Sequence, residues 1–116
     1  MAIKSGQIVL FKFPQTNLVL GRNRPALLLV SLPTAYNDWL VCMISSKTHQ
    51  AVTGIDELIS TTDTDFSQSG LKSESVIRLT RLAVVSDSIL LGNIDEVSSI
   101  RLKRLKKNLA DWIETS

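Results

Sequence analysis

The first half of this chain is a series of short apolar stretches separated by polar turns, a pattern that leaves no room for a long helix. Three stretches, at 7–13, 25–30 and 39–44, are only six or seven residues long and contain few polar side chains. Such runs, bounded by Pro14, by Pro33 and by Asn37 with Asp38, are typical of buried strands. Three strands in quick succession predict an antiparallel meander.

The second half predicts further strands and one helix. We expect an edge strand at 55–59, a Ser-, Thr- and Asp-rich loop at 60–69 and a turn at 70–72. In the strand that follows at 75–85, alternation places Val76, Arg78 and Thr80 on one face and Ile77, Leu79 and Arg81 on the other. The apolar piece 89–94 ends before Asp95, which we expect to be a helix N-cap.

The C-terminal segment predicts an amphipathic helix. Leu102, Leu105, Leu109, Trp112 and Ile113 recur at intervals of three and four residues, as one helical stripe does. Ile100 falls off this stripe. The strands and this helix together predict one mainly β domain over 1–116, a small, strongly curved, partly open β-barrel with the helix packed on it.

Basic residues concentrate on this predicted helix. Five of the thirteen lie at 101–107, whereas the rest of the chain holds eight basic against eleven acidic residues. The segment fits a patch for nucleic acid or an acidic partner. The solvated polar face of an amphipathic helix is the better interpretation of this segment.

Composition excludes several classes of protein. No apolar run approaches the length of about 20 residues that spans a membrane, and the N-terminus lacks the apolar core of a secretory signal. We therefore expect a cytoplasmic protein without membrane association. One cysteine, Cys42, and one histidine, His49, argue against a disulfide, a zinc site and a Ser-His-Asp triad. We expect no metal and no other cofactor.

Arg24 precedes Pro25 at the start of the second apolar stretch. Proline favours extended geometry in the residue before it, so the arginine stands at the entrance of the strand. Its guanidinium stays protonated and presents a planar fork that fits phosphate oxygens. A solvated surface arginine is the equally weighted alternative.

The ordered segments together resemble a known family. Their order and spacing resemble the PemK/MazF family of type II toxin–antitoxin toxins. The segments that carry the resemblance are residues 6–11, Gly21 with Arg24-Pro25-Ala26-Leu27, residues 41–46, residues 70–76 and the closing helix. The resemblance implies an SH3-like barrel, a homodimer and a cognate antitoxin protein that threads over the dimer groove. It also implies a metal-independent endoribonuclease that cuts single-stranded RNA, such as mRNA, at short sequences and so arrests growth.

The resemblance assigns catalysis to Arg24 and Ser45. RNA can be cut by its own 2′-hydroxyl, so the enzyme need only align the attack and stabilise charge on phosphorus. Without the resemblance, Ser45 reads as a strand-end residue capping Lys47 or Thr48. Candidates for RNA binding are Arg22, Ser46, Lys47, His49, Arg78 and Arg81.

The chain also departs from the family pattern. Its loop carries Leu18-Val19-Leu20 where many relatives have small, acidic or amide residues. Family members have an acidic residue along the strand at 75–85, and the nearest positions here hold Thr80 and Ala83, so that acid is missing. The general base for RNA cleavage would then be His49, a water or the substrate's own hydroxyl. Few aromatic residues are available to stack on bases: Tyr36, Phe66 and Trp39, of which Trp39 is expected in the core.

Two other functions therefore stay open. One is a protein-targeting toxin like the gyrase poison CcdB, which binds its target through the terminal helix. A helix that ends in Trp112-Ile113 fits this function in part. The other is a catalytically silent relative that acts as a binding module.

Overall fold

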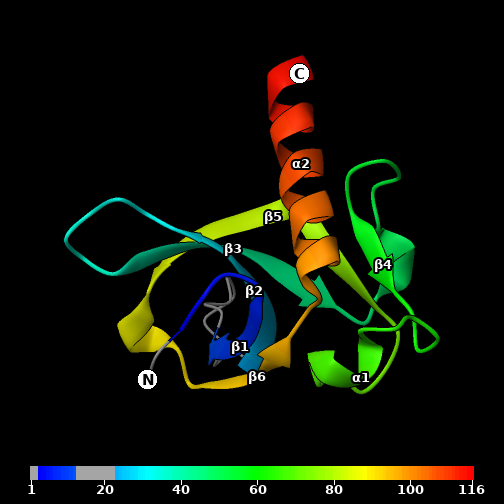
Figure 1. Ribbon diagram of the computed structural model, residues 1–116, viewed down its shortest axis with the longest axis horizontal. Coiled ribbons are helices and arrows are strands. Elements are labelled where there is room, and N and C mark those ends of the chain that lie inside the picture. Colours follow the sequence, from blue (N-terminus) through cyan, green and yellow to red (C-terminus); the bar gives the residue numbers. More distant parts are fainter. Residues whose placement is uncertain (1–2, 13–22) are drawn as a thin grey trace, which may run out of the picture.

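The computed structural model describes residues 3–12 and 23–116, and their strands form one antiparallel sheet in the order β4-β5-β3-β2-β1-β6. The sheet curves into a half-barrel, and a helix stands against it (Figure 1). The strands are β1 (Gln7–Lys12), β2 (Asn23–Ser31), β3 (Asp38–Ser45), β4 (Glu57–Ile59), β5 (Ser75–Ser86) and β6 (Gly92–Glu96). The helices are α1 (Phe66–Ser69) and α2 (Ser99–Thr115), with short 3-10 turns at Thr48–Gln50 and Asp87–Ile89.

This architecture confirms the predicted fold class. Strands β1, β2 and β3 pair in sequence as a meander, and β4 is the predicted edge strand. The loop predicted at 60–69 differs in one respect, because its end forms the single turn of α1. Gly70 ends that turn with a φ of +73°, a conformation that glycine adopts at little cost.

Alternation along the strands buries apolar side chains on both faces of the sheet. On the face toward α2, Leu27 and Cys42 pack with Leu105 of the helix. On the other face, Leu28 and Val41 form a second cluster with Trp39, which is in the core as predicted. The sheet is therefore a layer between two apolar clusters, which fixes the direction of every side chain along β2 and β3.

The predicted helix is confirmed, but its predicted start is wrong. Leu105 and Leu109 are buried, whereas Ile100 is 74% exposed, as expected for a residue off the stripe. Asp95 is not the N-cap, because β6 continues through it and pairs it with Ile8 of β1. Ser98 is the N-cap, and its Oγ accepts a hydrogen bond from the N–H of Arg101.

The C-terminal half of α2 extends past the sheet (Figure 1). Ile113, which the stripe placed on the apolar face, is accordingly 62% exposed. Neither helix of the described part of the chain is long and apolar enough to cross a membrane.

Candidate functional site

A cleft of about 500 Å³ opens where β2 begins and β3 ends, and the segment 70–73 forms its far wall. A second hollow of about 220 Å³ shares Arg24, Ser45 and Lys47 with this cleft and adds Arg78 and Arg81. Because the two hollows share these residues, we treat them as one site and call it the cationic cleft.

Strand register explains why Arg24 and Ser45 meet. Strand β2 pairs with β3 through Ala26 opposite Met43, and continuing that register by two residues brings Arg24 level with Ser45. Both side chains then point to the sheet face opposite α2, as Ala26 does. Met43 in turn pairs with Arg78 of β5, which places that arginine on the same face.

The cleft carries a strong positive charge. Five basic side chains line it, and none of the described lining residues is acidic. They are Arg24, Lys47, Lys72, Arg78 and Arg81. Several cations with no acidic side chain in the described lining suit a polyanion such as a nucleic-acid backbone, since a cation can neutralise a phosphate.

The structure brings together most of the residues predicted from the sequence. Arg24, Ser45, Ser46, Lys47, Arg78 and Arg81 all line the cationic cleft. His49 is exposed on the neighbouring 3-10 turn and does not line the cleft, so its part in RNA binding stays a prediction. Arg22 and the segment 18–20 lie outside the described residues.

Sequence reasoning missed Lys72 and Gln50 as members of the site. Lys72 follows the turn at Gly70 and lines the far wall of the cleft. Its position just before β5, within a segment that carries the family resemblance, was the available signal.

Ser45 has the local role that its place at a strand end suggests. Its Oγ accepts a hydrogen bond from the N–H of Lys47 at 3.1 Å, as a strand-end cap does. A hydroxyl that accepts one bond still has its own proton to donate. The capping bond therefore orients the Ser45 hydroxyl at the cleft and leaves it able to contact a phosphate oxygen.

Cys42 carries the one thiol of the chain, and it is no candidate for the nucleophile. Its side chain is fully buried. Burial, and to a lesser degree the nearby Asp56 carboxylate, raise the pKa of Cys42 to about 12. The thiol is therefore protonated at neutral pH and packs as a small apolar side chain.

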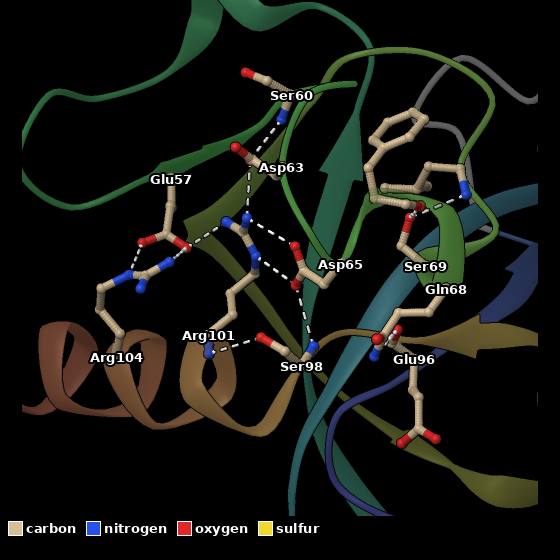
Figure 2. Close-up of polar contacts among 12 residues, drawn as sticks. Glu57, Ser60, Asp63, Asp65, Gln68, Ser69, Glu96, Ser98, Arg101 and Arg104 are labelled. Atoms are coloured by element: carbon tan, nitrogen blue, oxygen red, sulfur yellow. Dashed lines mark hydrogen bonds and ion pairs between the residues drawn. The ribbon is translucent and has the colours of Figure 1, made fainter.

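The basic run on α2 is largely engaged in ion pairs. Figure 2 shows the Arg101 guanidinium among three carboxylates, with contacts of 2.8 Å to Asp65, 2.9 Å to Asp63 and 2.7 Å to Glu57. Arg104, one turn further along, pairs with the other oxygen of Glu57 at 2.6 Å. We call these five residues the Arg101 cluster.

Burial and hydrogen bonding act in opposite directions on the Arg101 cluster. Burial alone would raise the pKa of the Asp65 carboxyl, but hydrogen bonds from Arg101 and from the Ser98 N–H hold that pKa below its usual value. Burial would likewise lower the pKa of Arg101, and its bonds to Asp65 raise it instead. The ionised pair is thus the stable form.

The Arg101 cluster supports the far wall of the cleft. Asp65 directly precedes α1, and Ser69 at the end of α1 is fully buried. The Oγ of Ser69 accepts a hydrogen bond from the N–H of Leu71, one residue before Lys72. A chain of contacts therefore runs from the start of α2 to the cleft, and Arg101, paired with three carboxylates, is not part of a free basic patch.

The fold and the site define a class: a β half-barrel with a cleft lined by basic residues at the end of its central strands. Residues 4–113 match the family model described as PemK-like, MazF-like toxin of type II toxin-antitoxin system. The match covers nearly the whole chain, and the protein belongs to this family. The resemblance inferred from the sequence is confirmed.

Solved structures share the fold. The Mycobacterium tuberculosis toxin MazF-mt6 superposes with a TM-score of 0.69 at 13% identity, over 93% of this chain and 96% of that one. An endoribonuclease in complex with its cognate antitoxin, from a mycobacterial species, superposes with a TM-score of 0.68 at 13% identity, over 99% of this chain and 98% of that one. No curated protein matches this chain.

Proposed function

We propose that this protein is a metal-independent endoribonuclease toxin that cuts single-stranded RNA at short sequences in the cytoplasm and is held inactive by a cognate antitoxin. The observation that carries the proposal is that Arg24, near the start of β2, and Ser45, at the end of β3, line one cleft that holds five basic residues. The family and the fold of the mycobacterial endoribonuclease support the same activity.

The chemistry needs little beyond alignment and charge. The substrate's 2′-hydroxyl attacks the adjacent phosphorus, and the 5′-oxygen of the next nucleotide leaves and takes up a proton from water. The Arg24 fork donates two hydrogen bonds to the non-bridging oxygens, where negative charge grows. Ser45 donates one more bond to the same phosphate. The proton of the attacking hydroxyl passes to water or to the substrate itself, since arginine cannot act as a base at neutral pH.

Incubation of purified, antitoxin-free protein with a long RNA in the presence of a chelator, read by primer extension, tests the proposal. We expect discrete cleavage at a short sequence. Arg24→Lys keeps the charge but loses the fork, and should lose about 2–4 kcal/mol of transition-state stabilisation. The matched control is Arg104→Lys, which should cut at nearly the normal rate because that side chain is 48% exposed on α2 and does not line the cleft. Near-normal cleavage by Arg24→Lys would refute the role of the fork.

A growth test separates this proposal from a non-catalytic toxin. Arg24→Ala should abolish growth arrest when the protein is expressed without its antitoxin. If arrest survives that change, the function lies elsewhere, and the end of α2 with exposed Ile113 becomes the surface to test.

We also propose a homodimer. Among the described strands, β4 and β6 are the edges of an open half-barrel, and an open edge offers unpaired backbone groups with which a second copy of the chain can pair. Light scattering at micromolar concentration should give twice the mass of the 12.8 kDa chain. A monomer would contradict this proposal without touching the assignment of Arg24.

A further inference from the structure

Asp56 is a buried carboxylate that the proposed chemistry does not use. Its side chain is 0% exposed, just before β4. Its oxygens accept hydrogen bonds from the N–H of Val52 at 2.9 Å, the N–H of Thr80 at 3.0 Å and the Oγ1 of Thr80 at 3.1 Å. A charge buried this completely requires compensation by another charge or by several donors.

The charged neighbour of Asp56 is Arg78, one of the cations of the cleft. The Nε of Arg78 lies 3.8 Å from Asp56 Oδ2, and the Nη1 donates to Gln50 Oε1 at 3.2 Å. The Nε is buried and makes no hydrogen bond to any described residue. The Nε of this guanidinium therefore lies beside Asp56, while the Arg78 side chain, 17% exposed, lines the cleft together with Gln50.

We propose that Asp56 is a positioning residue that holds the Arg78 guanidinium in the orientation in which it binds an RNA phosphate next to the one cut. The proposal rests on the proposed nuclease function. The carboxylate reaches Arg78 from the segment before β4, and the hydroxyl of Thr80 on β5 donates to that carboxylate and helps to hold it in place.

Two features separate positioning from catalysis and from simple packing. Asp56 is fully buried and is not among the lining residues of the cleft, so it acts through Arg78 and does not touch substrate. A merely structural Asp56 would tie β4 to β5 through Thr80, and its loss would then affect folding without depending on Arg78.

A double-mutant cycle tests this dependence. Asp56→Asn keeps the shape and removes the charge, and we expect kcat/KM for RNA cleavage to fall about tenfold when Arg78 is present. In the Arg78→Ala background the same change should alter cleavage by less than about twofold. Thr80→Val is the matched control, because it removes the hydroxyl bonds to Asp56 but leaves the carboxylate beside Arg78. Equal losses from Asp56→Asn in both backgrounds would overturn the proposal.

A measurement on the unmodified protein keeps the proposal testable if Asp56→Asn does not fold or if the protein cuts no RNA. The Nε–H signals of ¹⁵N-labelled arginines report how firmly each guanidinium is held. We expect the Arg78 Nε–H to exchange with solvent more slowly than that of exposed Arg81, the internal reference. Equal exchange rates would refute the positioning role, whereas slow exchange without any RNA cleavage would refute only the nuclease function.

Discussion

Replacing Arg101 with methionine should lower the free energy of unfolding by about 3–5 kcal/mol, the usual cost of breaking a buried ion pair from one side. Arg101 is 6% exposed and Asp65 is 3% exposed, so the substitution leaves a carboxylate away from water without its cation. Methionine keeps the apolar stem of the side chain, so the loss is chiefly electrostatic. Proteins of this size have about 5–15 kcal/mol of stability in all, and the loss would be a large share of it.

Urea unfolding followed by circular dichroism measures this loss. With a denaturant slope of about 1–3 kcal/mol per molar, the midpoint should fall by about 2 M. Arg104→Met on the same helix is the control, because Arg104 pairs with Glu57 at a side chain that is 48% exposed. Exposed pairs contribute about 0–1 kcal/mol, so its midpoint should move little. If the unfolding free energy of Arg101→Met differs from that of the unmodified protein by less than about 1 kcal/mol, as we expect for the control, the reasoning about the Arg101 cluster is wrong.

Three further outcomes follow from the same structure. The difference in unfolding free energy between the unmodified protein and Arg101→Met should become smaller below about pH 4. In the unmodified protein the pKa of Asp65 is lowered, so its ion pair stabilises the fold above the pKa of the unfolded chain and this stability is lost when Asp65 is protonated, whereas in the variant protonation removes an uncompensated charge. Thermal unfolding from pH 3 to 7 measures this difference, and a difference that stays constant would contradict the prediction. Lys72→Ala should weaken RNA binding and reduce its salt slope by about 1, while Lys103→Ala on α2 should change neither; anisotropy titrations at several salt concentrations would show the reverse ranking if the RNA surface were the helix. Ser45→Ala should reduce cleavage less than Arg24→Ala, since it removes one neutral hydrogen bond and not a charged fork, and an equal loss in primer extension would argue against that division of roles.

Local sequence was sufficient wherever neighbouring residues decide structure. Apolar stretches bounded by turn residues predicted the meander of β1 to β3, and intervals of three and four predicted α2, because these patterns report which face of an element is buried. Arg24 could be placed at a strand entrance because the following proline restricts its backbone. Ser45 was recognised both as a strand-end cap, which the structure confirms, and as a candidate for phosphate contact.

Contacts between distant segments were decided only by the tertiary structure. The carboxylates that bury Arg101 lie 36, 38 and 44 residues earlier in the chain, so nothing near 101 distinguishes it from the solvated cations around it. Asp56 likewise meets Thr80 from 24 residues away, a contact that no pattern within β5 predicts. The start of α2 moved from Asp95 to Ser98 because pairing with β1 extends β6. Periodicity and turn chemistry act over a few residues, whereas ion pairs and strand ladders depend on how the chain closes on itself, and that closure assembled the cationic cleft.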